Sequence, residues 1–239
     1  MDEKSSTFSI GMLTFDWPVV ISTLVAAILV FLLVFFLSRN LQMRPKGKQN
    51  ILEWMIDFVN GIVESSLPNA TGTEVKLFAF VMFLFIFVSN QLGLALQVEV
   101  GGVTFLKSAT ANLLVTMTLG LVAIGLGHML GVAKLGFKGY FKNVYLTPYT
   151  LLLPINIMEQ FTSFLTLSMR LFGNIMAGEM LLMLIAGFGL PGGSFGWQTV
   201  PAFFLSMIWQ GFSLFIGAVQ AYVFVTLMNV YISEKTIAE

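Results

Sequence analysis

The chain has 239 residues and no formal net charge; 57% of its residues are hydrophobic and only 10% are charged. Soluble globular domains are about 45–50% apolar and about 25% charged, so the composition indicates an integral membrane protein, and zero net charge gives no support for a nucleic-acid partner. The lack of cysteine and the single histidine exclude disulfides, thiolate nucleophiles and multi-histidine metal sites, and we expect neither a metal nor a cofactor.

Five apolar stretches are long enough to cross a membrane. Residues 1–17 precede them and lack the basic start and cleavage site of a secretory signal, so we interpret them as a short tail outside the membrane. About 20 apolar residues span the hydrocarbon core, where unpaired backbone groups are costly, so each stretch is predicted to be a helix. The predicted spans are 18–37, 77–96, 109–131, 154–187 and 199–232.

Between the first two spans, residues 50–66 have the pattern of an amphipathic helix. Glu53, Asp57, Asn60 and Glu64 recur at helical spacing, and apolar residues fill the other faces. Such a helix lies along the inner membrane surface or packs on another subunit, and the pattern leaves both interpretations open.

The last two spans are longer than a membrane requires. At about 1.5 Å per residue, about 34 residues extend about 51 Å, against a hydrocarbon core of about 30 Å, so either the helix ends protrude or the helices tilt strongly. The ends are not especially polar, which favours strong tilt. Gly and Pro within 188–199 predict a turn, and Thr199 and Pro201 suit the start of the last helix. The predicted fold is an all-α integral membrane protein, a single domain over 1–239. It has five embedded helices and one amphipathic surface helix, and the last two helices form a long, strongly tilted hairpin.

The distribution of Lys and Arg predicts the orientation in the membrane. Five spans put the termini on opposite sides, and basic residues gather in cytoplasmic loops. With the N-terminus outside and the C-terminus in the cytoplasm, only Lys4 and Lys107 fall outside, and Arg170 stays within the membrane. The other nine basic residues fall inside: Arg39, Arg44, Lys46, Lys48, Lys76, Lys134, Lys138, Lys142 and Lys235.

The stretch MRLFGNIMAGEMLLML, residues 169–184, carries a positive charge at the centre of the fourth span. An arginine there costs about 2.5–3.5 kcal/mol on insertion scales, and Arg170 is too far from either interface to reach it. It must therefore face protein, a water-filled cavity or an acid on a partner. A buried ion pair that only locks helices together is the alternative to an ion pathway.

Helical geometry sorts the neighbours of Arg170. At about 100° per residue, small and polar residues share its face, and small residues let another helix approach closely. Glu179 points to the opposite side, towards the outer end, so two separate polar entries fit better than one pore. Structural pairing is the alternative for Glu159 and Glu179. The residues on the face of Arg170 are Glu159, Ser163, Thr166, Gly173, Asn174 and Ala177.

Polar residues of the other spans give further signals. Ser206, Ser213 and Gln220 recur every seven residues on one face of the last span. If the hairpin turns near residue 193, Gln220 lies near the level of Arg170 and can orient its guanidinium by a hydrogen bond; the alternative is a bond to a helix backbone.

The second and third spans carry weaker polar signals. Packing hydrogen bonds are the favoured role for Asn90, Gln91 and Asn112, with an outer water pocket as the alternative. His128 is interpreted as structural. The GxxxG of residues 127–131 predicts close helix packing.

The segments PINIMEQFTSFLTLSMRLFGNIMAGEMLLMLIAG and GAVQAYVFVTLMNVYI resemble the last two helices of subunit a of F-type ATP synthases, of the bacterial and chloroplast type. The RLFGN-xx-AGE core is highly specific, whereas the first half matches in layout more than in motif. The resemblance implies a proton-conducting stator subunit that is no enzyme by itself. It also implies two offset half-channels beside a rotating c-subunit ring, whose carboxylates Arg170 deprotonates and keeps apart.

The resemblance also implies roles for other residues. Asn174, Glu179 and Gln220 match polar residues of the proton path and its surroundings, and Glu159 matches an acid near the inner channel. Some relatives have a histidine near the position of Ser213, so any relay here must use water, Ser213 or Glu179. The implied partners are the c-subunit ring, the peripheral-stalk b subunits, the rest of the synthase and the lipid bilayer, in a bacterial plasma membrane.

Two rival functions remain. A secondary transporter would use the arginine to hold an anionic substrate, but such folds usually show internal repeats and helices broken at mid-depth, which this sequence lacks. An intramembrane enzyme needs a nucleophile with a base or a metal cluster, which one histidine and no cysteine do not supply.

Overall fold

The computed structural model describes most of the chain, and helices account for most of what it describes. Five of its helices are long and apolar enough to cross a membrane: α1 (Trp17–Ser38), α3 (Thr73–Ala95), α4 (Leu113–Phe141), α5 (Leu153–Gly189) and α6 (Thr199–Thr236). The predicted all-α membrane fold is therefore confirmed. The described residues are 7–10, 13–39, 42, 47–67, 73–95, 98–100, 103–106, 108–146, 150–189 and 196–236.

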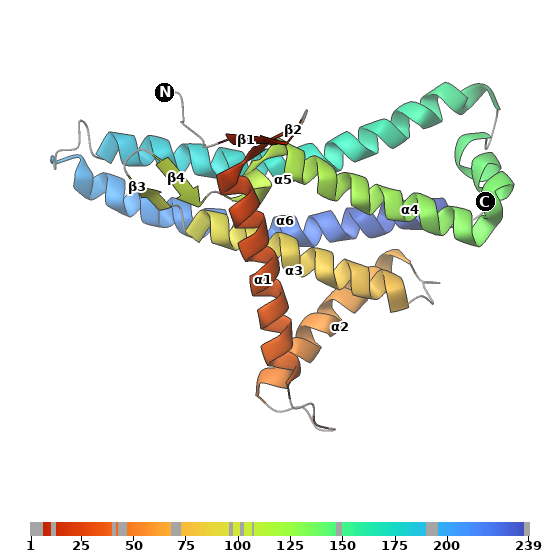
Figure 1. The fold of residues 1–239 in the computed structure, drawn as a ribbon, viewed down its shortest axis with the longest axis horizontal. Coiled ribbons are helices and arrows are strands. Elements are labelled where there is room, and N and C mark those ends of the chain that lie inside the picture. The colour runs from red at the N-terminus through yellow and green to blue at the C-terminus, as the bar shows by residue number, and fades with distance from the viewer. Residues whose placement is uncertain are drawn as a thin grey trace. The chain divides into compact units, whose positions relative to one another are not determined.

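The shorter elements connect these helices (Figure 1). The predicted amphipathic helix is α2 (Lys48–Ser66). Two antiparallel hairpins, which the sequence analysis did not predict, precede α1 and follow α3; their strands are β1 (Thr7–Ile10) with β2 (Leu13–Asp16), and β3 (Val98–Val100) with β4 (Val103–Leu106). Single helical turns at η1 (Ala109–Ala111) and η3 (Thr150–Leu152) lead into α4 and α5, and a π-helical turn, η2 (Lys142–Leu146), follows α4.

The chain forms two compact units, each assembled from three segments. Unit 1 contains Met1–Leu33, Leu84–Asn112 and Leu171–Ala221. Unit 2 contains Val34–Phe83, Leu113–Arg170 and Tyr222–Glu239. Four of the boundaries fall within α1, α3, α5 and α6, so each of these helices contributes one part to each unit, and the remaining boundary lies directly before α4.

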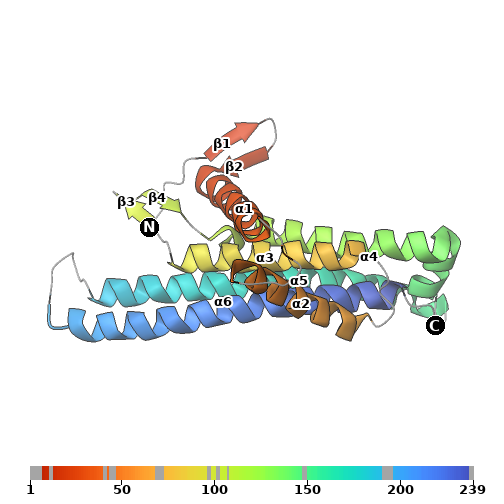
Figure 2. The ribbon, with the colours of Figure 1, turned by 90° about the horizontal axis from the view of Figure 1, so that it is seen from below.

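In unit 1, the end of α5 and the start of α6 form an antiparallel hairpin, as predicted (Figure 2). The hydroxyl of Thr199 donates to the carbonyl of Gly189 at 2.7 Å, and the indole of Trp209 donates to the carbonyl of Gly178 at 3.3 Å. Thr199 is the first residue of α6 and Pro201 lies in its first turn, where a missing N–H costs nothing. With 37 and 38 residues, α5 and α6 each extend about 55 Å, which is longer than a hydrocarbon core of about 30 Å.

In unit 2, α2 packs one apolar face against its neighbours and leaves another exposed. Leu52, Val59, Ile62 and Val63 are buried, and the ring of Phe58 lies against those of Phe83 and Tyr222. Lys76 at the start of α3 forms an ion pair with Glu64 at 2.6 Å. These contacts explain the amphipathic pattern on one side of α2, while Ile51 and Trp54 stay exposed, so the described residues of unit 2 do not cover its second apolar face.

The second half of α4 packs closely on the end of α6 in unit 2. A Cβ added to Gly127 would lie 3.3 Å from Lys235, and one added to Gly131 would lie 2.7 Å from the carbonyl oxygen of Lys235. The predicted close packing at this GxxxG is therefore confirmed. His128, interpreted as structural, contacts the hydroxyl of Tyr140 and the ammonium of Lys235, the latter at 3.2 Å.

Two boundaries differ from the prediction for the third span, 109–131. The helix begins at Leu113, after η1, and runs on beyond residue 131 until Gly136, where φ is 71°. Hydropathy alone does not register a break made by one glycine, because a left-handed φ is a backbone property that the neighbouring apolar residues do not reveal.

Candidate functional site

Arg170 lies at the middle of α5 and is the last residue of this helix that belongs to unit 2. Its side chain is exposed. Among the described residues of its unit, no carboxylate forms an ion pair with it. The guanidinium is permanently charged, so it requires water or a carboxylate from outside this unit to compensate it. This arrangement does not fit the alternative of a locking ion pair formed within unit 2.

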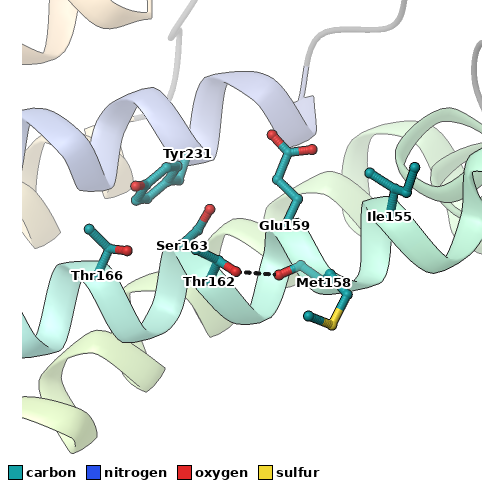
Figure 3. A pocket seen from close by; sticks show the side chains of 7 residues that line it. All are labelled: Ile155, Met158, Glu159, Thr162, Ser163, Thr166 and Tyr231. Carbon is teal, nitrogen blue, oxygen red and sulfur yellow. Dashed lines mark hydrogen bonds between the residues drawn. The ribbon is translucent and has the colours of Figure 1, made fainter.

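About three turns of α5, including part of its polar face, line a pocket in unit 2 (Figure 3). The pocket has a volume of about 430 Å³, and Glu159, Ser163 and Thr166 point into it beside Tyr231 of α6. The three α5 residues are half of the six that were predicted to share a face with Arg170, and Glu159 is exposed to solvent there. Tyr231 is a lining residue that the sequence analysis missed, because an aromatic residue near a helix end reads as packing.

Glu179 is buried in unit 1, with 2% of its surface exposed. Its carboxylate accepts a hydrogen bond from the backbone N–H of Ser108 at 3.2 Å. The hydroxyl of Ser108 lies 2.8 Å from that of Thr110, which donates to the amide oxygen of Asn90 at 2.7 Å. A continuous chain of polar groups therefore links Glu179 on α5 to Asn90 on α3.

The amide side chains of α3 also hold α6 in unit 1. Asn90 donates to the carbonyl of Gly217 at 2.9 Å, and Gln91 donates to the carbonyl of Leu214 at 3.0 Å. The sequence favoured packing hydrogen bonds as the role of both residues, and both side chains do form hydrogen bonds to the backbone of a neighbouring helix. Asn90 does more than pack, however, because its amide oxygen belongs to the chain of polar groups that leads to Glu179.

Two more predicted site residues lie on α6 in unit 1. Gln220 is buried, and its amide oxygen accepts a hydrogen bond from Asn174 of α5 at 2.7 Å. Ser213 is also buried next to Gly178, and its hydroxyl has no hydrogen-bond partner among the described residues. The predicted bond between Gln220 and Arg170 stays a prediction, whereas Gln220 and Asn174 are brought together directly.

The face of α5 near Asn174 is open. Gly173, Asn174 and Ala177 are exposed, and among the described residues no side chain lies within 4 Å of a Cβ added to Gly173. Small residues on an exposed apolar helix permit close approach of a second helix. This part of α5 is therefore suited to a helix supplied from outside the unit.

Gly93 lets the segment after β4 reach Glu179. A Cβ added to Gly93 would lie 2.0 Å from the Cβ of Ser108 and 2.3 Å from its Cα. We expect Gly93→Ala to push Ser108 away from Glu179 and to cost about 1–3 kcal/mol of stability, as overpacked cores do. The thermal dissociation midpoint of the purified complex that contains the chain checks this, and should fall.

Gly61→Ala is the matched control for Gly93→Ala. Gly61 lies in α2, and in the part of the chain that the structure describes no atom lies within 4 Å of an added Cβ, so alanine there should be neutral or stabilise the helix by up to about 1 kcal/mol. Equal dissociation midpoints for Gly93→Ala and the wild type would contradict the close approach of α3 and Ser108.

Comparison with known proteins assigns the chain to a family. The sequence model of the family described as "ATP synthase A chain" matches residues 19–233. This chain belongs to the ATP synthase A chain family. ATP synthase subunit a of Pediococcus pentosaceus is 51% identical over 233 residues, which cover 98% of this chain and 97% of that protein. Subunit a of Limosilactobacillus fermentum is 49% identical, and the match covers 100% of both chains. Subunit a of Enterococcus hirae is 50% identical, and the match covers 98% of both chains.

Family membership explains the composition and the long helices. A member of the ATP synthase A chain family is a multi-pass membrane subunit of a larger complex, and it is not an enzyme by itself. The fold and the resemblance inferred from the last two helices are thereby confirmed, and the match now extends over nearly the whole chain.

Proposed function

We propose that this chain is the proton-conducting stator subunit of a rotary ATP synthase, in which Arg170 separates two offset half-channels beside a ring of c subunits. The observation that carries the proposal is a permanently charged side chain at the middle of a 37-residue apolar helix, exposed and without an ion pair among the described residues of its unit. Such a charge is too costly to keep in a membrane without a compensating partner.

The partner in this proposal is a mobile carboxylate. A protonated acid on a c subunit is neutral and crosses lipid at low cost, whereas the field of the guanidinium lowers the pKa of a carboxyl group that comes close to it. The acid therefore loses its proton beside Arg170 and regains one from the other half-channel. Each charge that crosses about 100 mV releases about 2.3 kcal/mol, which biases the direction of rotation.

The outer half-channel in this proposal runs past Glu179. A buried carboxylate with an N–H donor can accept and release a proton, and the hydroxyls and amides that continue from it to Asn90 can orient water. Ser213 and the amide nitrogen of Gln220 are buried polar groups without a partner among the described residues, and ordered water usually satisfies such groups.

The inner half-channel opens at the pocket of Glu159. The pocket volume of about 430 Å³ accommodates several waters, and polar groups of Ser163, Thr166 and Tyr231 line it. In the proposed orientation, with the N-terminus outside and the C-terminus in the cytoplasm, Glu159 is near the cytoplasmic end of α5. The b subunits of the peripheral stalk hold the stator, and the open face of Gly173 and Ala177 receives the ring.

Glu159→Gln tests the inner half-channel. Glutamine keeps the size and polarity of the side chain but cannot exchange a proton, so ATP-driven proton pumping by the complex should fall. We expect a loss of about threefold to tenfold, well below the about 100-fold that positioned acid–base groups contribute, because Glu159 is exposed and water can replace it. Fluorescence quenching of a pH dye in proteoliposomes measures the rate.

Glu53→Gln on α2 is the control for Glu159→Gln, since it removes one carboxylate from the same unit outside the pocket. It should pump at the wild-type rate. If both variants slow pumping equally, the effect belongs to surface charge and the inner entry is located elsewhere.

The transporter and enzyme alternatives have their own tests. Substrate uptake by the purified chain alone would favour a transporter, and proteolytic or lipid-cleaving activity lost in Arg170→Ala would favour an enzyme. Proton movement that requires the assembled complex supports the stator function instead.

A further inference from the structure

The end of α4 turns into a separate basic and aromatic segment, which no part of the proposed proton path uses. Gly136 has φ 71° and ψ 158°, outside the helical region, so the helix axis breaks there. Residues 137–141 then continue as helix and pass into the π-helical turn η2, Lys142–Leu146. We call residues 134–146, which include the two residues before the break, the post-kink segment.

The post-kink segment is rich in basic and aromatic residues. Its sequence, KLGFKGYFKNVYL, contains three lysines and four aromatic residues and no acidic residue. The three lysines, Lys134, Lys138 and Lys142, are all exposed and recur every four residues. Next to two of them stand Phe137, 74% exposed, and Phe141, 45% exposed.

The other side of the post-kink segment is fixed to unit 2. Tyr140 is only 5% exposed; its hydroxyl contacts His128, and its ring lies within 2.7 Å of a Cβ added to Gly131. The ring of Tyr145 lies against that of Phe141 with the centroids 5.2 Å apart, and the carbonyl of Tyr145 accepts a hydrogen bond from Asn156 at 3.1 Å. The lysines and phenylalanines are therefore presented outward by a segment that is anchored at both ends.

An anionic lipid surface matches this outward face. Lysines just beyond a membrane helix attract anionic headgroups, and aromatic rings beside them insert at the boundary between headgroups and acyl chains. The other surface element, α2, has the opposite charge balance, with Glu53, Asp57 and Glu64 against Lys48 alone. Attraction to anionic lipid therefore belongs to the post-kink segment and not to amphipathic helices of this chain in general.

We propose that the post-kink segment is a binding site for anionic phospholipid headgroups, on the cytoplasmic leaflet in the proposed orientation. The three lysines contact lipid phosphates, and the two exposed phenylalanines lie among the upper acyl chains. Bound lipid then holds the inner end of α4 at the membrane surface, and Tyr140, through His128 and Lys235, ties that position to the end of α6.

A site-specific probe tests this proposal in the assembled complex. The chain has no native cysteine, so Gly139→Cys in the exposed part of the segment gives this subunit one site for an environment-sensitive fluorophore. The complex is placed in nanodiscs of phosphatidylcholine with increasing phosphatidylglycerol, and the fluorescence response gives an apparent affinity. We expect Lys138→Gln to weaken it about fivefold and glutamine at all three lysines to weaken it more than about tenfold.

Matched variants separate charge from damage to the fold. Arginine at all three lysines keeps the charge and should stay within about twofold of the wild type, as should Lys48→Gln on α2. An equal response to phosphatidylcholine and phosphatidylglycerol, or no change in the triple glutamine variant, would overturn the proposal. So would a response to inorganic phosphate in detergent that matches the lipid response, or a probe insensitive to lipid because another subunit covers the segment.

Discussion

Arg170→Ala should abolish ATP-driven proton pumping by the assembled complex while ATP hydrolysis by its soluble head continues. Without the guanidinium, nothing lowers the pKa of the ring carboxylate at the meeting point of the two half-channels, so protonated and ionised carboxyls are no longer sorted by side. Pumping should fall to the level of liposomes without the complex. A pH-sensitive dye inside proteoliposomes measures pumping, and phosphate release from the same sample measures hydrolysis.

Passive proton flux through the complex gives a second test of the role of Arg170. In the proposed mechanism the fixed cation is also the barrier between the two half-channels, so a potassium diffusion potential should drive protons through the Arg170→Ala complex at least as fast as through the wild type. Lys48→Ala, which removes an exposed positive charge from α2, should leave both pumping and passive flux unchanged. Normal pumping by Arg170→Ala would refute the proposed role of the arginine.

Glu179→Gln should slow proton flow strongly without preventing assembly. The glutamine oxygen can still accept the hydrogen bond from the N–H of Ser108, so the local packing is kept. What is lost is the group that takes up and releases a proton in the outer half-channel. We expect a decrease of about 10- to 100-fold in pumping, up to the lower limit of the roughly 100-fold to 10,000-fold that positioned acid–base groups contribute.

Two further variants test whether Glu179→Gln slows pumping because the ionisable group is lost. Glu179→Asp retains the ionisable group and should restore part of the rate, although its shorter side chain weakens the contact with Ser108. Glu74→Gln, at the exposed start of α3, should pump normally. Flux equal to the wild type across a series of pH values would count against Glu179 as a proton carrier.

The helices were predictable because hydropathy and helical spacing act locally. The last helix starts at Thr199 as predicted, and the amphipathic helix of 50–66 is found as Lys48–Ser66. The hairpins β1–β2 and β3–β4 were missed because they are only three or four residues per strand and depend on pairing between strands, which hydropathy does not register. The break at Gly136 was missed for a similar reason, since one glycine among apolar residues does not reveal its φ.

The site could be predicted where its residues lie on one helix, and less well where it depends on contacts between residues that are far apart in the sequence. Glu159, Ser163 and Thr166 were grouped correctly by helical geometry, and they line one pocket. Ser108 and Thr110 were not identified, because Ser108 meets Glu179 across 71 residues of sequence and the hydropathy pattern assigned their segment to a span boundary. The orientation in the membrane, the single-domain assignment and the roles of the site residues stay predictions.

An experimental structure of this chain assembled with its c ring and peripheral stalk in a lipid bilayer would test the central claim most directly. The measurement is the distance from the guanidinium of Arg170 to the nearest carboxylate, together with the path of ordered water. We expect a ring carboxylate close to Arg170, with water reaching Glu159 from one side and Glu179 from the other and no continuous water between them. A guanidinium paired permanently with an acid of its own chain, away from the ring and from both water paths, would contradict it.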